Sequence, residues 1–374
     1  MMSRSRPAAA LPQSPAEPPI GSAAAPARSG AIGGGASLSI GLSAVIVAAS
    51  VQEPRVLTIK LPVGKLPAGR SLGDHGDGEV VEALPSGPLE AEHRTLEIGL
   101  RSWVERQTSQ SLGYVEQLYT FGDRDRTAGD GALALPALVV AYLALVREAR
   151  PAGSTGAEWR SWYRYLPWED WRDGRPALLD PIEAALRRWA ERGSGEAERR
   201  LREERLGLAF GLSGAAWNEE LVLERYELLY EAGLVAEAAR DLGRPAASPA
   251  ATPVPSTDGA TGTEMALDHR RILATAIGRL RGKIKYRPVV FELMPPAFTL
   301  LQLQRTVEAL AGVRLHKQNF RRLVEQQGLV EETGEMSGPT GGRPARLVRF
   351  RREVLLERPA PGLRLRPARR ATPP

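Results

Sequence analysis

The C-terminal third of the chain, from residue 264 onward, contains an order of short segments that few folds can satisfy. MALDHRRILATAIGRLRGKI predicts a helix, RPVVFEL a short strand, and FTLLQLQRTVEALAG a second helix. Thr299 and Gln302 have the spacing of a capping box, and Gly312 is placed where a left-handed residue would end that helix. After the turn VRL, HKQNFRRLVEQQ predicts a third helix that ends at Gly328, and LVEETGEMSGPTGGRPARLVRFRR predicts two strands around a glycine-rich tip.

This order is that of a winged helix-turn-helix domain, which we expect to bind double-stranded DNA. At about 100° per residue, Phe320, Leu323 and Val324 share the buried face of the third helix. The opposite face carries Gln and Arg side chains, which can bond adenine and guanine in the major groove. The residues that we expect to contact DNA are Thr299, Lys317, Gln318, Asn319, Arg321, Arg322, Arg343 and Arg346. A winged helix used only for protein contacts is the alternative.

Charge is distributed unevenly and favours a polyanionic partner for the same region. Residues 264–374 contain 22 Lys and Arg against 10 Asp and Glu, a net charge of +12, which leaves the first 263 residues at −6. Such an asymmetry is typical of a part that binds nucleic acid. Only 5 of the 50 basic residues are lysine, so an arginine-rich composition could also produce this excess.

Composition also divides the chain into parts. GRPAASPAATPVPSTDGATGT, residues 243–263, has the composition of a flexible linker. We therefore predict a disordered tail (1–36), a folded N-terminal domain (37–242), the linker (243–263), the winged helix (264–352) and a disordered basic tail (353–374). The absence of cysteine excludes disulfides, and the four scattered histidines argue against a zinc site. No stretch reaches the roughly 18 apolar residues of a membrane span, so we expect a cytoplasmic protein.

The N-terminal part predicts a mixed α+β fold. LSIGLSAVIVAASVQEPRVLTIKLPV indicates two strands around a turn, AEHRTLEIGLRSWVERQT a helix, YVEQLYTFGD a strand, and ALALPALVVAYLALV a buried central strand. A tryptophan-rich stretch follows, with Trp159, Trp162, Trp168 and Trp171. It could cover a core or a dimer contact, or it could form a base-stacking wall in a ligand cleft. Helical segments occupy residues 181–242.

Residues 87–109, GPLEAEHRTLEIGLRSWVERQTS, resemble the Nudix box without a gap. Gly87, Arg101, Trp103 and Glu105 match the pattern, with Trp103 at an aliphatic position. The departures are His93, Ser102, Arg106, Thr108 and Ser109. In the Nudix box, three glutamates at positions i, i+3 and i+4 share one helix face and hold Mg²⁺.

Those positions are Ser102, Glu105 and Arg106 in this chain, so their summed charge is zero instead of −3. We therefore expect no metal site and no catalytic residues. The alternative is a Nudix pyrophosphohydrolase that acts on ADP-ribose-like dinucleotides, with a metal site rebuilt from acids such as Glu92, Glu97 or Glu116.

Taken together, the segments resemble the NrtR-like transcriptional regulators of bacterial NAD metabolism. The resemblance is carried by EQLYTFGD, RLRGKIKYRPVVFELMPPAFTLLQLQ, HKQNFRRLVEQQGLV and GGRPARLVRF and covers residues 38–352. The tryptophan-rich insert and the helices of residues 180–242 are additional and resemble a longer branch.

This resemblance implies an α/β/α Nudix-like sandwich with a mixed sheet, followed by a winged helix-turn-helix domain. It implies a homodimeric repressor of genes for NAD biosynthesis or salvage, which needs no cofactor and senses ADP-ribose, NAD or ATP as its effector. The residues that we expect to bind the effector are Arg101, Glu105, Tyr119 and Phe121. A pure protein-interaction adaptor is the third interpretation.

Overall fold

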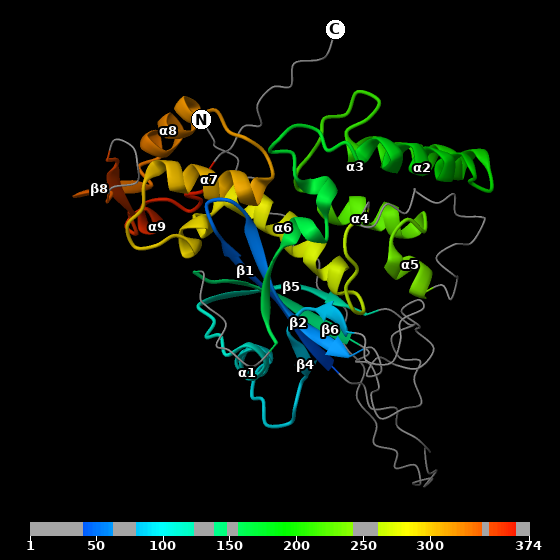
Figure 1. The fold of residues 1–374 in the computed structure, drawn as a ribbon, viewed down its shortest axis with the longest axis horizontal. Helices are drawn as coiled ribbons and strands as arrows, with labels where there is room; N and C mark the ends of the chain where they lie inside the picture. The colour runs from blue at the N-terminus through cyan, green and yellow to red at the C-terminus, as the bar shows by residue number, and fades with distance from the viewer. Residues whose placement is uncertain are drawn as a thin grey trace, which may run out of the picture. The chain divides into compact units, whose positions relative to one another are not determined.

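The computed structural model describes residues 40–62, 80–122, 138–147, 156–241, 261–338 and 344–363. A mixed sheet forms the centre of the N-terminal part (Figure 1). Its strands are β1 (Ile40–Ala49), β2 (Pro54–Pro62), β3 (Val80–Ala83), β4 (Ser86–Pro88), β5 (Tyr114–Phe121), β6 (Leu138–Leu145) and β7 (Glu158–Ser161). The order is β3-β2-β1-β6-β5, with β4 also paired to β1 and β7 to β2. Among the described strands of this sheet, β1 and β6 are the one pair that runs parallel. The two strands predicted around the first turn are confirmed as β1 and β2.

Helices cover both faces of this sheet because its central strand is apolar on both sides. Successive side chains of β1 point to opposite faces, and nearly all are buried. Leu100 and Val104 of α1 (Leu96–Thr108) pack on one face with Leu42 and Ile46. Val45 and Val47 lie in the core on the other face, which α6 (His269–Tyr286) and α7 (Leu300–Ala311) cover (Figure 1). The predicted sandwich is therefore present.

The tryptophan-rich segment and the helices after it belong to the second of these cores. The segment contains two short 3-10 helices, η3 (Trp162–Arg164) and η4 (Pro167–Glu169). Trp162 and Trp168 are fully buried in the core, so neither can act as an open stacking wall. The helices that follow are α2 (Leu179–Glu191), α3 (Glu196–Phe210), α4 (Val222–Glu231) and α5 (Ala236–Asp241). Among them, α4 packs closely on α6.

The C-terminal part has the predicted winged helix arrangement. Thr299 and Gln302 form the capping box at the start of α7, and Gly312 ends that helix with φ of 72°. After the turn comes α8 (Lys317–Gln326), and β8 (Val330–Met336) pairs antiparallel with β9 (Arg346–Phe350). A bridge between Phe298 and Val348 adds the residue before the Thr299 cap to this hairpin.

One prediction in this region is wrong. RPVVFEL is not a strand but contains the 3-10 helix η5 (Val289–Leu293), in which every side chain except that of Glu292 is buried. A strand would have pointed alternate side chains away from the core, so the tighter turn buries more apolar surface. The pairing with the hairpin is supplied by Phe298 instead.

The basic tail predicted from residue 353 is ordered at its beginning. Residues 354–357 form α9 (Val354–Glu357), and Val354 is fully buried. Leu363 is also fully buried, and its backbone N–H donates to the carbonyl of Ile284 in α6 at 2.8 Å. Two apolar side chains within an arginine-rich composition are enough to hold this stretch on the helix. Residues 1–36, most of the predicted linker (242–260) and residues 364–374 lie outside the described part.

The part of the chain that contains the mixed sheet shares packed residues with the winged helix. One core cluster contains both Val45 of the sheet and Phe320 of α8. Residues 38–374 accordingly group as one compact unit. The composition change at residues 243–263 therefore does not separate two independent cores.

Candidate nucleic-acid interface and the altered Nudix box

The outward face of α8 is polar along its whole length. Phe320 and Val324 are buried and fix the helix on the core, as the helical period predicted. Leu323 is half-buried. The exposed side chains of this face include Gln318, Asn319, Arg321, Arg322 and Glu325. This face carries donors suited to base edges and has no apolar residue that would need covering.

A cleft with a volume of about 700 Å³ lies between the start of α7, α8 and the hairpin. Of the residues predicted to contact DNA, those that line it are Thr299, Lys317, Arg321 and Arg346. Gln318, Asn319 and Arg322 lie on the exposed surface of α8 outside this lining. Arg343 lies outside the described residues. The structure therefore gathers side chains from three separate elements at one concave surface.

Acidic residues partly balance the positive charge of the cleft. Arg346 pairs with Glu332 at 2.7 Å, and Arg349 pairs with Glu331 at 2.5 Å. The hydrogen bond that Arg346 donates to Glu332 raises the pKa of Arg346 above its ordinary value. Within the described part of the chain, Lys317 and Arg321 make no ion pair. Neither of these two cations therefore has to leave an ion pair with a described residue before it meets an anion.

A buried carboxylate holds the turn between α7 and α8. Glu308 is only 5% exposed, and it accepts hydrogen bonds from the Leu315 N–H and the Gln304 Nε2, both at 2.9 Å. Arg314 approaches its other oxygen at 3.4 Å. Sequence reasoning missed this residue, although an acid between Val307 and Ala309 on the buried side of an amphipathic helix was the available signal.

In α1, the Nudix-box arginine has a structural role. Arg101 pairs with Glu97 at 2.8 Å and donates to the carbonyls of Leu112 and Gly113, which lie just before β5. Glu105 is exposed. A Cβ on Gly87 would meet the Trp103 ring at 2.1 Å, so the glycine is required for this packing.

Metal-binding geometry is absent from the described residues. No group of three or more His, Cys, Asp or Glu side chains among them could hold a metal ion. Glu97 is engaged by Arg101, and Glu116 by Tyr114 and Lys283. Glu92 is exposed on the surface. The acids suggested as substitutes for the missing ligands therefore do not converge with Glu105.

The four predicted effector-binding residues do not gather at one place. Arg101 and Glu105 belong to α1, which covers one face of the sheet. Phe121 is buried in the core on the opposite face, and its ring meets that of Tyr119 edge-on at 5.4 Å. Tyr119 is 62% exposed, so it is the aromatic side chain of this pair that a ligand can reach.

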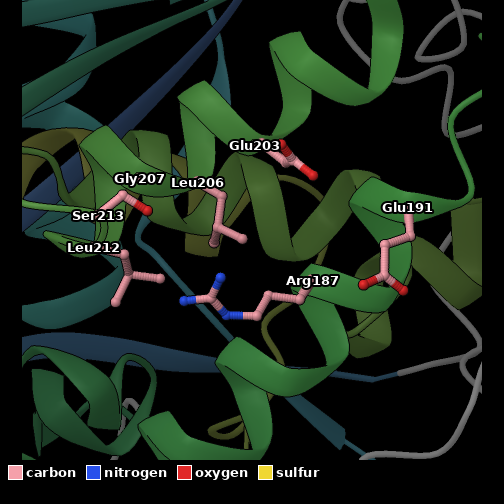
Figure 2. A pocket seen from close by; sticks show the side chains of 7 residues that line it. All are labelled: Arg187, Glu191, Glu203, Leu206, Gly207, Leu212 and Ser213. Carbon is pink, nitrogen blue, oxygen red and sulfur yellow. The ribbon is translucent and has the colours of Figure 1, made fainter. Parts of the chain in front are cut away.

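A smaller pocket of about 220 Å³ lies between α2 and α3 (Figure 2). Its lining residues are Arg187, Glu191, Glu203, Leu206, Gly207, Leu212 and Ser213. Arg187 extends between the two helices, while the charged residues of the rim are exposed. The lining contains no buried charged group that would select a ligand. Sequence reasoning gave no sign of it.

None of the helices in the described ranges is long and apolar enough to cross a membrane.

The family model described as "NrtR DNA-binding winged helix domain" matches residues 290–350. A curated relative, the ADPR responsive transcriptional repressor NtrR of Acinetobacter baylyi, is 44% identical over 87 residues, which are 23% of this chain and 34% of the relative. The match thus spans about a third of that protein's length.

Two solved structures resemble the whole chain more distantly. Shewanella oneidensis NrtR in complex with a 27mer DNA is 18% identical with a TM-score of 0.46, covering 84% of this chain and 94% of that one. A MutT/nudix family protein from Enterococcus faecalis is 14% identical with a TM-score of 0.45, covering 86% and 90%.

Proposed function

We propose that this chain, whose residues 290–350 match the NrtR DNA-binding winged helix family, is a transcriptional repressor that binds operator DNA through α8 and the β8–β9 hairpin. The observation that carries this proposal is the cleft where Thr299, Lys317, Arg321 and Arg346 meet beside the polar face of α8. The similarity of the same region to an ADPR responsive repressor supports it.

The cleft and the helix face suggest a division of roles at the DNA. Arg321, Arg322 and Gln318 would read base edges, since arginine bonds guanine through two hydrogen bonds and glutamine bonds adenine. Lys317 and Thr299 lie at helix starts, where backbone N–H groups also favour phosphate. Arg346 would exchange Glu332 for a phosphate. Asn319 and Arg343 remain proposed contacts.

The N-terminal part is proposed to sense a nucleotide and not to hydrolyse one. ADP-ribose is the first choice because the related repressor is named for its response to it; NAD and ATP are the alternatives. With one carboxylate among Ser102, Glu105 and Arg106, binding would proceed without a divalent cation. Arg101, Glu105 and Tyr119 are the proposed contacts, whereas Phe121 would support Tyr119 from the core.

We further propose that the chain acts as a homodimer and represses genes of NAD biosynthesis or salvage. Two copies of α8 would then read half-sites about one helical turn apart.

Selection of tight binders from a random duplex library tests the proposal without knowledge of the operator. We expect a half-site pair to be enriched, and its affinity to exceed that of a scrambled duplex by about 10³-fold or more at physiological salt. Affinity equal for the two duplexes at every salt concentration would overturn the DNA-binding role. Adding ADP-ribose, NAD or ATP to the selected complex then identifies the effector by the change in affinity, and no response to any nucleotide would overturn the sensing role.

A further inference from the structure

The last turn of α7 ends against the tryptophan-rich segment and not against solvent. The final carbonyls of a helix have no partner within the helix and must be satisfied by other groups. Here the Tyr163 hydroxyl donates to the Ala309 carbonyl at 2.7 Å, and Arg281 Nε donates to the Leu310 carbonyl at 3.0 Å. The Gly312 carbonyl accepts from the Trp171 N–H at 2.7 Å.

These contacts are organised by a buried carboxylate, Glu169 of η4. Its two oxygens accept from Arg225 of α4 at 2.6 and 2.9 Å, and one of them also accepts from Arg281 of α6 at 2.6 Å. The side chains of Glu169 and Arg225 are fully buried, and that of Arg281 is 1% exposed. Since a buried charge is tolerated only when it is paired and hydrogen-bonded, each member fixes the others in place.

The same segment is attached to the sensing sheet at its other end. β7 pairs with β2 in the register Arg55–Ser161 to Thr58–Glu158, and η3 begins at the next residue, Trp162. Only eight positions separate Ser161 from Glu169 in the chain. The tryptophan-rich segment thus joins the edge of the sheet directly to the helix that precedes α8.

We propose that Glu169 is a positioning residue for DNA binding: through Arg281 it fixes the end of α7 and the following turn, and so sets the orientation of α8 relative to the sensing sheet. The positive charge of Arg281 beside the C-terminal carbonyls of α7 adds a favourable dipole interaction. The role in DNA binding rests on the proposed function, whereas the fixation of the α7 end can be tested without it.

A matched control exists on the same helix. Arg270 of α6 pairs with Glu237 at 2.5 Å, and both side chains are as buried as the Glu169 set. Among the described residues, the hydrogen bonds of this pair run to the backbone of Thr261, Thr263, Met265 and Tyr165, and none reaches α7. Glu237→Gln therefore removes a comparable buried charge from a pair that meets the tryptophan-rich segment at the Tyr165 carbonyl but does not contact the end of α7.

Hydrogen–deuterium exchange of the full chain tests the linkage. In Glu169→Gln, the amides of residues 308–316 should exchange about tenfold faster or more than in the wild type, while Glu237→Gln leaves them unchanged. If Glu169→Gln is too unstable to purify, Tyr163→Phe, which removes one hydroxyl, should accelerate the same amides. Unchanged protection at 308–316 in the variant that folds, or equal acceleration in Glu237→Gln, would overturn the linkage.

The selected duplex then provides the second readout. Glu169→Gln should weaken specific binding at least tenfold while keeping binding to a scrambled duplex, because α8 remains folded but is wrongly oriented. Specific affinity unchanged in Glu169→Gln would overturn the positioning role. If the wild type itself shows no specific binding, the proposed function fails, while the exchange experiment still decides whether the end of α7 is fixed by Glu169.

Discussion

The guanidinium of Arg106 donates to the carboxylate of Glu90 at 3.0 Å and lies 4.0 Å from the centre of the Trp103 ring. In an active Nudix box this position carries a glutamate that faces a metal ion. The arginine instead brings a positive charge to that face and fastens α1 to the loop before it. At this position α1 therefore has a contact that stabilises the helix and no carboxylate.

Restoring the carboxylates should restore metal binding. The double variant Ser102→Glu, Arg106→Glu places three glutamates on one helix face with Glu105, the arrangement that binds Mg²⁺. We expect millimolar Mg²⁺ to raise the Tm of this variant and not that of the wild type. AMP release from ADP-ribose by the wild type, if Mg²⁺-dependent and abolished in Glu105→Gln, would contradict the non-catalytic interpretation.

Removing one arginine from the exposed face of α8 should weaken specific DNA binding. Arg322→Ala is expected to cost about 1–3 kcal/mol on the selected duplex if the side chain contacts a base, with relaxed preference at one position. Arg200→Ala, an exposed arginine of α3, is the control and should leave affinity unchanged. Fluorescence anisotropy at several salt concentrations separates loss of base contact from loss of phosphate contact.

Gly312 should tolerate no side chain. Its φ of 72° costs a non-glycine residue about 1–2 kcal/mol, and an added Cβ would lie 2.4 Å from the Glu169 carbonyl oxygen. Gly334→Ala has only the backbone cost, because the φ of Gly334 is 81° and no heavy atom lies within 4 Å of the added Cβ. Chemical denaturation should therefore show a clearly larger loss for Gly312→Ala. Equal losses would mean that the contact with Glu169 is absent in solution.

The capping box should contribute measurably to the stability of α7. Thr299→Ala removes the side-chain acceptor for the Gln302 N–H and should lower the free energy of unfolding by about 1 kcal/mol. Thr299→Ser keeps the hydroxyl, so its free energy of unfolding should lie close to that of the wild type. A full loss in the serine variant would assign the effect to packing of the methyl group instead.

The free energy of unfolding should depend on pH through the ionisation of Glu169. Burial alone would raise the pKa of this carboxyl, but Arg225 and Arg281 lower it below its ordinary value. A carboxyl whose pKa is lower in the folded state stabilises the fold above its unfolded pKa, about 4.3, and loses that contribution as the pH falls through the folded value. The stability difference between wild type and Glu169→Gln should thus be full at pH 7 and shrink below about pH 4. A difference that is constant from pH 7 to pH 3 would contradict the ion pairing.

Local patterns predicted most helices and strands because their signals lie within a few residues. Thr299, Gln302 and Gly312 marked the ends of α7, and the spacing of Phe320 and Val324 gave the buried face of α8. The same local reasoning failed at η5, since a run of apolar residues does not reveal whether one side or both will be covered. There the outcome depended on Phe298, which is the residue that pairs with the hairpin.

The linkage around Glu169 could not be predicted in this way. Arg225 and Arg281 lie 56 and 112 positions after Glu169 in the sequence. Each of the three is a charged residue in a segment that contains many others. The effector residues had the opposite difficulty: Tyr119 and Phe121 lie two positions apart on β5 and share one face of the strand, but the sequence does not indicate that α1 covers the other face of the sheet. Sequence patterns locate elements, whereas convergence of side chains from distant elements needs the fold.

The pairing of β7 with β2 limits how early the sheet can fold while the chain is being synthesised. Thr58 donates to the carbonyl of Glu158 across 100 positions, and β1 finds its parallel partner only when β6 has been made. Contacts of such long sequence separation form slowly, because a large loop must close before any pairing is gained. On the ribosome, the apolar strand β1 must therefore wait, unpaired on one side, until β6 at residues 138–145 has emerged, and aggregation or chaperone capture would compete with folding during this interval.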